Sequence, residues 1–362
     1  MSLIVSAFWI GLGVLLVTSF LVIIGQWRLF LRREQPSGQA SLLPVDSQAI
    51  AQHLAEAIRC QTTPRDEQGT PDPEAFRQLH HFLAERYPLV HAHLKREVIN
   101  GYSLLYVWKG SDPGLPPAQF MAHQDVVSCP EDTLADWTYP PFAGVIADGF
   151  IWGRGALDIK NQVIGILEAA ETLLAQGFQP QRTLHFAFGH DEETGGANGA
   201  RVLGQLLHER GVSLAGIVDE GGGIFDGLSP GVQGLVAGIC FNEKGYLTIE
   251  FRVKTESGHS SMPPDHTAIG ILAAAMARLE KHPIRPTLKW ARHGYWGLGS
   301  VVPLHLEIAF ANSWLFGPLL IRWLKKAPEA STAIRTTQAL TVFQAGYEDN
   351  TIPAEACALV NF

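Results

Sequence analysis

The chain has 362 residues and a formal net charge of −8, with 46% hydrophobic and 17% charged residues. This is the composition of a globular protein that is long enough for two domains. The acidic balance argues against a nucleic-acid-binding protein, which would carry a basic surface. The sequence also indicates neither a thiolate zinc site nor a disulfide framework, because its four cysteines are widely spaced and form no Cys-x-x-Cys pair.

The first segment of the chain is apolar enough to cross a membrane. Residues 3–25 carry no charge, and about 20 apolar residues span a bilayer. A cleaved signal peptide is the alternative, but it would have a basic start, a shorter apolar core and a cleavage site between small residues. Residues 1–34 are therefore predicted to form a single transmembrane anchor with a basic flank, Arg28, Arg32 and Arg33. The side of the membrane on which the body lies stays open.

After a polar, proline-containing linker at residues 35–48, helical and strand-like stretches alternate. The periodicity predicts helices at 49–59, 72–86, 162–176 and 197–210, and strands at 104–109, 117–123, 183–188 and 216–219. This alternation favours an α/β domain, a largely parallel sheet flanked by helices, over residues 49–241. Sites in such domains lie at the carboxyl ends of the strands.

The pattern changes near residue 242. Strand, helix, strand, strand are expected at 246–255, 268–280, 337–345 and 355–362. This order favours a smaller α+β (ferredoxin-like) domain over residues 242–362, incomplete because it stops within a strand. The intervening stretch, rich in Trp, Pro and Leu, fits no single period. Within it, residues 314–323 are predicted to be a buried helix rather than a contact with a membrane surface.

Residues 184–196, LHFAFGHDEETGG, combine an apolar strand with a run of acids. Leu184, Phe186 and Phe188 precede three adjacent carboxylates, those of Asp191, Glu192 and Glu193. Adjacent carboxylates repel one another, and burying them is costly unless a cation lies among them. The segment alone is explained equally well by a solvated acidic turn and by a metal site.

Three other polar segments supply partners for such a site. His123 and Asp125 are two residues apart, so they point to the same side of a strand. Asp158 follows a glycine-containing turn at a helix start, and Asp219 ends an apolar strand. Each has a structural explanation by itself, as a core His–acid pair, an N-cap and an acidic turn. With Glu192 and Glu193, however, they form a set from four segments that suits two Zn²⁺ ions bridged by a carboxylate and a hydroxide.

In their order and their residues, these motifs resemble those of the acetylornithine deacetylase, succinyl-diaminopimelate desuccinylase and carboxypeptidase S family of zinc metallopeptidases. The resemblance is greatest to the carboxypeptidase S and N-fatty-acyl-amino-acid hydrolase branch, and it runs from about residue 48 to the end. Seven segments carry it: MAHQDVV, WGRGALDIKN, GHDEETGG, VDEGGG, NEKGY, GHSSMPP, and RTTQALTVFQAG with NTIP.

The resemblance implies a metal-binding role for four residues. Asp158 would bridge two Zn²⁺ ions, His123 and Asp219 would complete one metal, and Glu193 would bind the other. Asp125 would orient the imidazole of His123. A carboxylate-rich site of this kind also accepts Co²⁺ or Mn²⁺.

Further residues receive catalytic and binding roles from the same resemblance. Glu192 would be the general base, and His259 would donate a hydrogen bond to the oxyanion. Asn350 would help to hold the substrate's carboxylate, although a turn residue before proline explains it equally well. Asp191 and Glu220 are expected to support the ligands.

The resemblance implies a zinc metallopeptidase, and the apolar first segment predicts that it is membrane-anchored. It would hydrolyse an amide bond next to a free carboxylate, in small peptides or N-acyl amino acids, through a metal-bridging hydroxide, with a possible homodimer formed through the smaller lid domain. The family's last metal ligand is a histidine near the C-terminus, expected beyond residue 362. The alternative is a truncated, inactive membrane protein that keeps the fold for partner binding.

Overall fold

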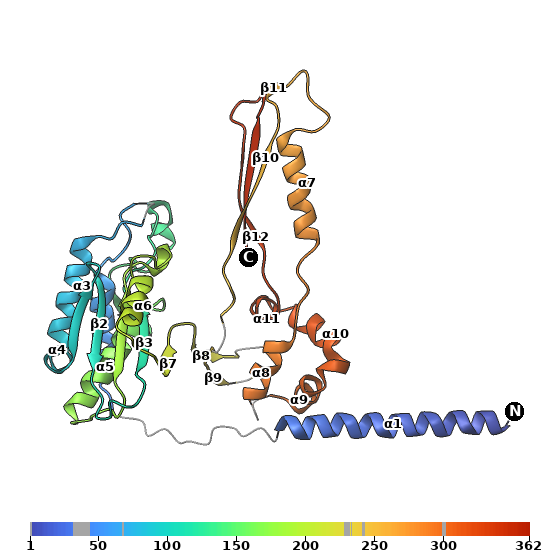
Figure 1. The fold of residues 1–362 in the computed structure, drawn as a ribbon, viewed down its shortest axis with the longest axis horizontal. Coiled ribbons are helices and arrows are strands. Elements are labelled where there is room, and N and C mark those ends of the chain that lie inside the picture. Colours follow the sequence, from blue (N-terminus) through green and yellow to red (C-terminus); the bar gives the residue numbers. More distant parts are fainter. Residues whose placement is uncertain are drawn as a thin grey trace. The chain divides into compact units, whose positions relative to one another are not determined.

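The computed structural model describes residues 2–31, 44–66, 69–227, 232, 234–240, 243–298 and 302–362. The chain divides into two compact units, residues 40–220 and residues 1–39 with 221–362, and each is described by itself (Figure 1). The second unit thus takes up the chain from residue 221, twenty residues before the predicted end of the catalytic domain at 241. Arg32, Arg33 and residues 35–43 of the predicted linker lie outside the described residues.

The helices of the first unit follow one another along the chain, and the first two begin at capping side chains. They are α2 (Ser47–Arg59), α3 (Pro73–Arg86), α4 (Pro88–His93), α5 (Lys160–Ala175) and α6 (Ala200–Glu209), with short 3₁₀ turns η1 (Glu131–Asp136) and η2 (Glu192–Thr194). The Asp46 carboxylate accepts the first free N–H groups of α2, and the Asp72 carboxylate does the same for α3. The four helices predicted for this unit are confirmed, and α4 is additional.

Five strands of the first unit form a mixed sheet. They are β1 (Lys95–Ile99), β2 (Ser103–Trp108), β6 (Leu184–Gly189), β3 (Ala118–His123) and β7 (Gly216–Val218), in that spatial order. The pairs of β6 with β3 and of β3 with β7 are parallel, whereas β1–β2 and β2–β6 are antiparallel. The expectation of a largely parallel sheet is therefore corrected: the parallel part is the half that carries the predicted polar clusters. A small hairpin, β4 (Val145–Ala147) with β5 (Phe150–Trp152), lies outside this sheet.

Helices bury both faces of the sheet. Alternate residues of β2 point to opposite faces. Leu104 and Tyr106 join a large cluster with residues of α2, α3 and α5, whereas Leu105 packs with Leu203 and Leu207 of α6. Because helices cover both faces of the sheet, we expect the site at the edge where the parallel strands end.

The second unit contains a three-stranded antiparallel sheet covered by a helix. Its strands are β10 (Thr248–Lys254), β14 (Glu355–Asn361) and β12 (Ala339–Ala345), in that order, and α7 (Ala268–Lys281) contacts β10 and β14 (Figure 1). Two further antiparallel strand pairs accompany it, β8 (Gly223–Asp226) with β9 (Leu235–Gly238) and β11 (Gly258–His259) with β13 (Thr351–Ile352). The predicted strand, helix, strand, strand order is confirmed.

The stretch that fits no single period folds into a helical cluster between α7 and β12. Its helices are α8 (Lys289–Gly297), α9 (Leu304–Ala311), α10 (Ser313–Leu324) and α11 (Pro328–Ala333). Phe310 is fully buried and stacks on Tyr295 at 3.9 Å between ring centroids. The predicted buried helix at 314–323 corresponds to α10, which buries Gly317, Leu320 and Leu324 but leaves its opposite face exposed.

The N-terminal segment is one long helix, α1 (Ser2–Leu31). Within the described part of the chain it is the one unbroken helix long and apolar enough to cross a membrane, over Gly11–Arg28 with a mean hydropathy of 1.6. The bent pair α9 and α10 passes the same test when taken together. An N-terminal signal sequence has these properties too, so the helix is compatible with a membrane anchor and with a signal sequence.

The strand that leads to the acidic run depends on buried aromatic packing. Replacing fully buried Phe188 by Ala is expected to lower the free energy of unfolding of the first unit by about 3–5 kcal/mol, because it leaves a cavity in the core. The matched control is Phe178→Ala, at a phenylalanine that is 46% exposed, with an expected loss of about 1 kcal/mol. Urea unfolding followed by circular dichroism measures both, and equal losses would contradict the proposed packing.

Candidate functional site

The parallel strands bring the predicted polar segments to one edge of the sheet. β3 ends at His123, which is in register with Gly189 at the end of β6, and β7 ends immediately before Asp219. Gln124 links the two strand ends, since its side-chain amide donates to the carbonyl oxygens of Phe188 and Tyr102 at 3.0 Å. The sequence analysis did not single out Gln124, because a glutamine between a histidine and an aspartate gives no signal of its own.

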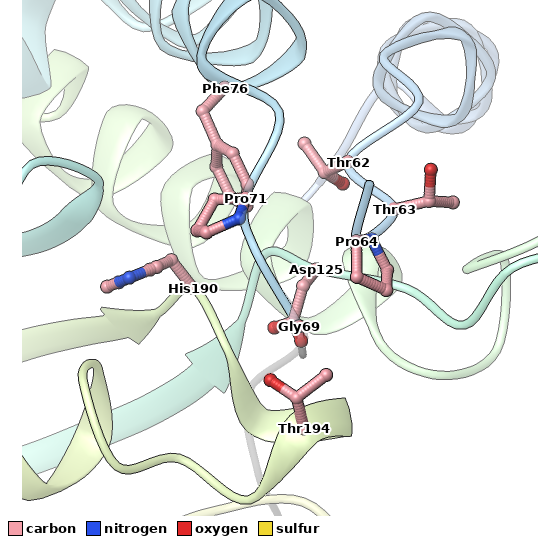
Figure 2. Close-up of a pocket in the computed structure, with 9 residues that line it drawn as sticks. All are labelled: Thr62, Thr63, Pro64, Gly69, Pro71, Phe76, Asp125, His190 and Thr194. Carbon is pink, nitrogen blue, oxygen red and sulfur yellow. The ribbon is translucent and has the colours of Figure 1, made fainter. Parts of the chain in front are cut away.

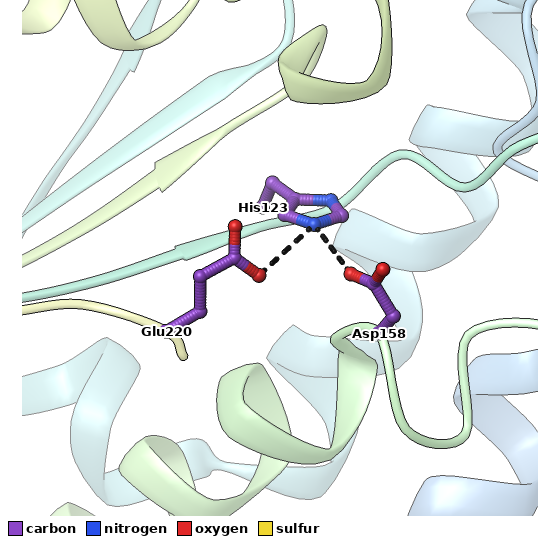
Figure 3. Close-up of side chains that lie close together, drawn as sticks. All are labelled: His123, Asp158 and Glu220. Atoms are coloured by element: carbon purple, nitrogen blue, oxygen red, sulfur yellow. Dashed lines mark hydrogen bonds and ion pairs between the residues drawn. The ribbon is translucent and has the colours of Figure 1, made fainter. Parts of the chain in front are cut away.

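His123 is the centre of the site. Its side chain is 3% exposed, and Nδ1 lies 2.9 Å from the backbone oxygen of Asp125. A carbonyl oxygen only accepts hydrogen bonds, so Nδ1 carries a hydrogen and Nε2 faces the acids. Nε2 lies 3.0 Å from Asp158 Oδ1, 3.6 Å from Glu220 Oε2 and 3.8 Å from Glu192 Oε2. Figure 3 shows Asp158 and Glu220 on the two sides of this nitrogen.

Asp158 is held by a tight turn and by the start of α5. Gly155, in the WGRGALD turn, has a φ of +83°, and a Cβ there would lie 2.7 Å from Val126 Cγ1. The turn closes through Lys160 N–H, which donates to the Gly155 oxygen at 3.0 Å. The Asp158–Ile159 peptide bond is cis. Position 155 therefore requires glycine, because a larger residue would be strained at this φ and would clash with Val126.

Lys160 ties this turn to the end of α2. Its ammonium group is buried and donates to the carbonyl oxygens of Ala57 and Cys60, where that helix leaves carbonyl groups unpaired. Burial lowers the pKa of Lys160 to about 8, although the neighbouring Cys60 and Asp125 act in the opposite direction. Gln162, in the first turn of α5, donates to the Met121 oxygen at 2.6 Å and so joins the helix to β3.

Asp125 holds the acidic turn as well as His123. Its side chain is 5% exposed, and its Oδ1 lies 3.4 Å from His123 Nδ1. Its two carboxylate oxygens accept the backbone N–H groups of Glu192 at 3.1 Å and Glu193 at 3.0 Å. Asp125 thus fixes the imidazole through its backbone oxygen and the backbone of both glutamates through its carboxylate. Asp191 accepts the Asn198 N–H at 2.7 Å, and its support of the ligands stays a prediction.

The two acids after β7 occupy different positions. Glu220, which the sequence analysis placed among the supporting acids, forms a group with His123 and Asp158 in which the ligand atoms lie within 4.8 Å of one another. Asp219, the predicted ligand, is exposed, and its Oδ1 accepts the Glu220 N–H at 3.0 Å. The role of Asp219 as a ligand stays a prediction, and Glu220 becomes a candidate beside it.

The electrostatics of the cluster favour bound protons or a bound cation. Burial disfavours a charged His123, but the hydrogen bond and charge of Asp125 outweigh it and raise the imidazole pKa to about 10. The pKa values of Glu192, Glu193 and Glu220 are also raised, chiefly by burial, with repulsion from neighbouring carboxylates adding to it and attraction to His123 opposing it.

A metal ion fits this donor set. An imidazole nitrogen and carboxylate oxygens are ligands that Zn²⁺ accepts, and the second imidazole nitrogen is fixed by a backbone oxygen as in other metal-bound histidines. A cation would replace the protons that otherwise offset the repulsion among the acids.

A recess beside the site is too small for a substrate. Figure 2 shows it between Asp125, His190 and Thr194 on one side and Pro64, Pro71 and Phe76 on the other. Its volume of about 10 Å³ is close to the minimum for one water molecule. An acyl amino acid or a dipeptide therefore does not bind there.

His259 and Asn350 lie together in the second unit. β11 pairs with β13 so that His259 is in register with Thr351, and Ser260 N–H donates to the Asn350 backbone oxygen at 3.0 Å. Ser261 N–H lies 3.2 Å from His259 Nδ1, so Nδ1 accepts and Nε2 carries the hydrogen in the neutral ring. Asn350 Oδ1 lies 3.3 Å from Thr351 Oγ1, which leaves the amide NH₂ as the donor.

Comparison with known proteins gives matches to two families. The model of peptidase family M20/M25/M40 matches residues 119–293, and that of a peptidase dimerisation domain matches residues 241–362. The chain is 43% identical to a probable carboxypeptidase S-like 2 of Dictyostelium discoideum, over 86% of this chain and 61% of the relative. It is 38% identical to the N-fatty-acyl-amino acid synthase/hydrolase of Xenopus tropicalis, over 100% of this chain and 71% of the relative.

Other relatives and solved structures agree with these matches. Carboxypeptidase S of Saccharomyces cerevisiae is 36% identical over 88% of this chain and 58% of its own length. The chain therefore spans 58–71% of these three curated relatives. The fold resembles an M20 family metallo-carboxypeptidase from Sulfolobus solfataricus, with a TM-score of 0.58, 18% identity and coverage of 88% and 71%. It also resembles human carnosine dipeptidase 1, with a TM-score of 0.54, 16% identity and coverage of 87% and 69%.

Asp125 is expected to control metal affinity without binding the metal. Asp125→Asn replaces one acceptor oxygen by an NH₂ group that faces a backbone N–H of the acidic turn, so the turn loses one of its two hydrogen bonds to residue 125, and His123 loses the charged neighbour of its Nδ1. We expect Zn²⁺ affinity to fall about 10–100-fold, as measured by competition with a chromophoric chelator. The matched control, Asp132→Asn at an exposed position of η1, is expected to leave the affinity unchanged. An equal affinity in both variants would contradict this role.

Metal binding is expected to release protons. His123 has a pKa of about 10, so a metal that binds Nε2 must displace a proton from the imidazole at neutral pH. Zn²⁺ affinity should therefore rise with pH, by about tenfold per pH unit for each proton released. Calorimetry between pH 6 and 8, in buffers that differ in ionisation enthalpy, counts these protons. An affinity that does not change with pH would show that the cluster is already deprotonated.

Proposed function

The chain belongs to peptidase family M20/M25/M40, and from this premise we propose that it is a metal-dependent hydrolase of amide bonds next to a free carboxylate. The observation that carries the proposal is the approach of Asp158, Glu220 and Glu192 to the buried Nε2 of His123. Such a cluster is suited to holding a cation, which would offset the repulsion among the carboxylates.

The proposed metal ligands are His123, Asp158, Glu193 and one or both acids after β7. Asp158 would bridge two ions, with Asp219 or Glu220 beside His123 on one and Glu193 on the other. Zn²⁺ suits these donors, and Co²⁺ or Mn²⁺ is also compatible with them. When bound, such a metal lowers the pKa of a water molecule and polarises the substrate carbonyl group.

Glu192 is proposed to be the general base. Its side chain is 50% exposed, so it is accessible to water and substrate. The Asp125 carboxylate accepts its backbone N–H and so fixes its backbone. Its raised pKa, caused chiefly by burial of the turn, brings it nearer to neutral pH. A carboxylate of this kind takes a proton from the attacking water and passes it to the leaving amine.

His259 and Asn350 are proposed to contact the substrate. The hydrogen on His259 Nε2 is suited to donate to the oxygen that becomes negative as the amide carbonyl is attacked. The Asn350 NH₂ group is suited to bind a terminal carboxylate. Their adjacency across β11 and β13 supports roles on neighbouring parts of one substrate.

The names of the relatives indicate the substrate class. One is called a probable carboxypeptidase S-like protein and another an N-fatty-acyl-amino acid synthase/hydrolase. A peptide with a C-terminal residue and an N-acyl amino acid share an amide bond next to a carboxylate. We therefore propose both as substrates, and a homodimer formed through the segment that matches the dimerisation domain.

The N-terminal helix is proposed to be a retained membrane anchor. α1 has 30 residues, and its side chains between Gly11 and Arg28 are not buried against the rest of the protein. An apolar helix of this length is stable in a bilayer and costly in water.

Substituting the two adjacent glutamates separates catalysis from metal binding. Glu192→Gln is expected to lower kcat for hydrolysis of an N-acyl amino acid by about 10²–10⁴-fold, because the amide accepts no proton, with metal content unchanged. Glu193→Gln is expected to lower the metal content itself. Activity assays and elemental analysis of the same preparations test both. Full activity of Glu192→Gln would refute the proposed base.

A further inference from the structure

Helix α10 carries apolar residues on two opposite faces. One face, with Gly317, Leu320 and Leu324, is buried in the helical cluster. The opposite face has Trp314 at 63%, Leu315 at 45% and Leu319 at 67% exposure. We refer to these three residues, with Arg322, as the outer face of α10. A surface helix of a soluble protein has one apolar face, which packs on the core. The exposed apolar outer face of α10 therefore indicates a binding surface.

Basic residues follow the apolar part of the outer face. Arg322 lies three residues after Leu319 and seven after Leu315, and thus on the same side of the helix. Lys325 and Lys326 follow at the end of α10, and all three basic side chains are exposed. Exposed Trp and Leu followed by Arg and Lys is the pattern of a helix that lies in a membrane interface.

The corner between α9 and α10 is attached to the last turns of α1. Asn312, which is fully buried at this corner, donates from its amide to the backbone oxygen of Ile23 at 3.1 Å. One turn further along α1, Trp27 Nε1 donates to Glu307 Oε2 of α9 at 3.3 Å. These bonds place the corner beside the C-terminal end of the apolar stretch of α1.

The position of these contacts along α1 corresponds to the edge of a bilayer. Ile23 is five residues before Arg28, a distance of about 7.5 Å along the helix. The interfacial layer on each side of the hydrocarbon core is about 5–8 Å thick. If α1 spans the membrane to Arg28, the α9–α10 corner lies at the boundary between headgroups and acyl chains, where tryptophan is also enriched.

We propose that the outer face of α10 rests on the lipid bilayer, as a second membrane contact beside α1. The proposal depends on the membrane anchor proposed above. A lipid surface is favoured over a second copy of the chain because it covers the apolar residues and pairs Arg322, Lys325 and Lys326 with anionic headgroups at once. The contact would hold the helical cluster of the second unit at the membrane surface.

Spin labels on the full chain test this contact. The protein, carrying Cys129→Ser, Cys240→Ser and Cys357→Ser so that only the buried Cys60 remains of its native cysteines, is reconstituted in vesicles of phosphatidylcholine and phosphatidylserine. A nitroxide is attached in turn after Leu319→Cys, Leu315→Cys, Val17→Cys or Tyr347→Cys. Val17 lies in the middle of the apolar stretch of α1, and Tyr347 is a 92% exposed residue of the same unit that lies far along the chain from α10.

The quantity measured is the ratio of collisions with O₂, which partitions into lipid, to collisions with a water-soluble nickel chelate. We expect this ratio to be several-fold higher at 315, 319 and 17 than at 347. A low ratio at 315 and 319 with a high ratio at 17 would overturn the α10 contact and leave the anchor intact. Low ratios at all three positions would overturn the anchor as well. Protection of 315 and 319 from both reagents would show that protein covers this face, and would also overturn the proposal.

Discussion

The structure depends on one electrostatic constraint, the gathering of several carboxylates around a single buried imidazole. Asp158, Glu192 and Glu220 approach His123 Nε2 within 4 Å, and Asp125 lies behind the ring. In water these acids would separate, because like charges repel and burial adds to the cost. The folded chain holds them together. Asp125 raises the pKa of His123 against the effect of burial, and burial, with repulsion between the carboxylates added to it, raises the pKa values of Glu192, Glu193 and Glu220.

The surrounding residues supply the positions that resist this repulsion. The carboxylate of Asp125 binds two backbone N–H groups of the acidic turn, so the turn is fixed by its backbone and its side chains remain available. Lys160 and Gln162 bind the start of α5 to α2 and β3 through hydrogen bonds. These bonds also fix the position of Asp158, which lies two residues before the helix. The family membership and the arrangement of the site therefore point to the same chemistry. A hydrolase of this kind requires a preorganised set of acids that a metal completes.

The sequence was informative where a local pattern determined the structure, and less so where the outcome depended on tertiary packing. The apolar strand before Asp191 and the helices with clear caps were predictable, because each rests on periodicity or on capping. β1 was missed because its sequence, KREVI, is that of a charged edge strand. The position of Glu220 was not predictable, since adjacent acids after a strand point in different directions. α10 escaped a simple pattern because both of its faces are apolar.

The most direct test of the metal site is anomalous diffraction at the zinc edge from crystals of the Zn²⁺-loaded protein. We predict a peak about 2.0–2.1 Å from His123 Nε2, with carboxylate oxygens of Asp158 and of Glu220 or Asp219 in the same coordination sphere. A second peak beside Asp158 and Glu193 would indicate the bridged pair. A map with zinc bound elsewhere, or with His123 Nε2 still bonded to Asp158 and no metal between them, would contradict the account.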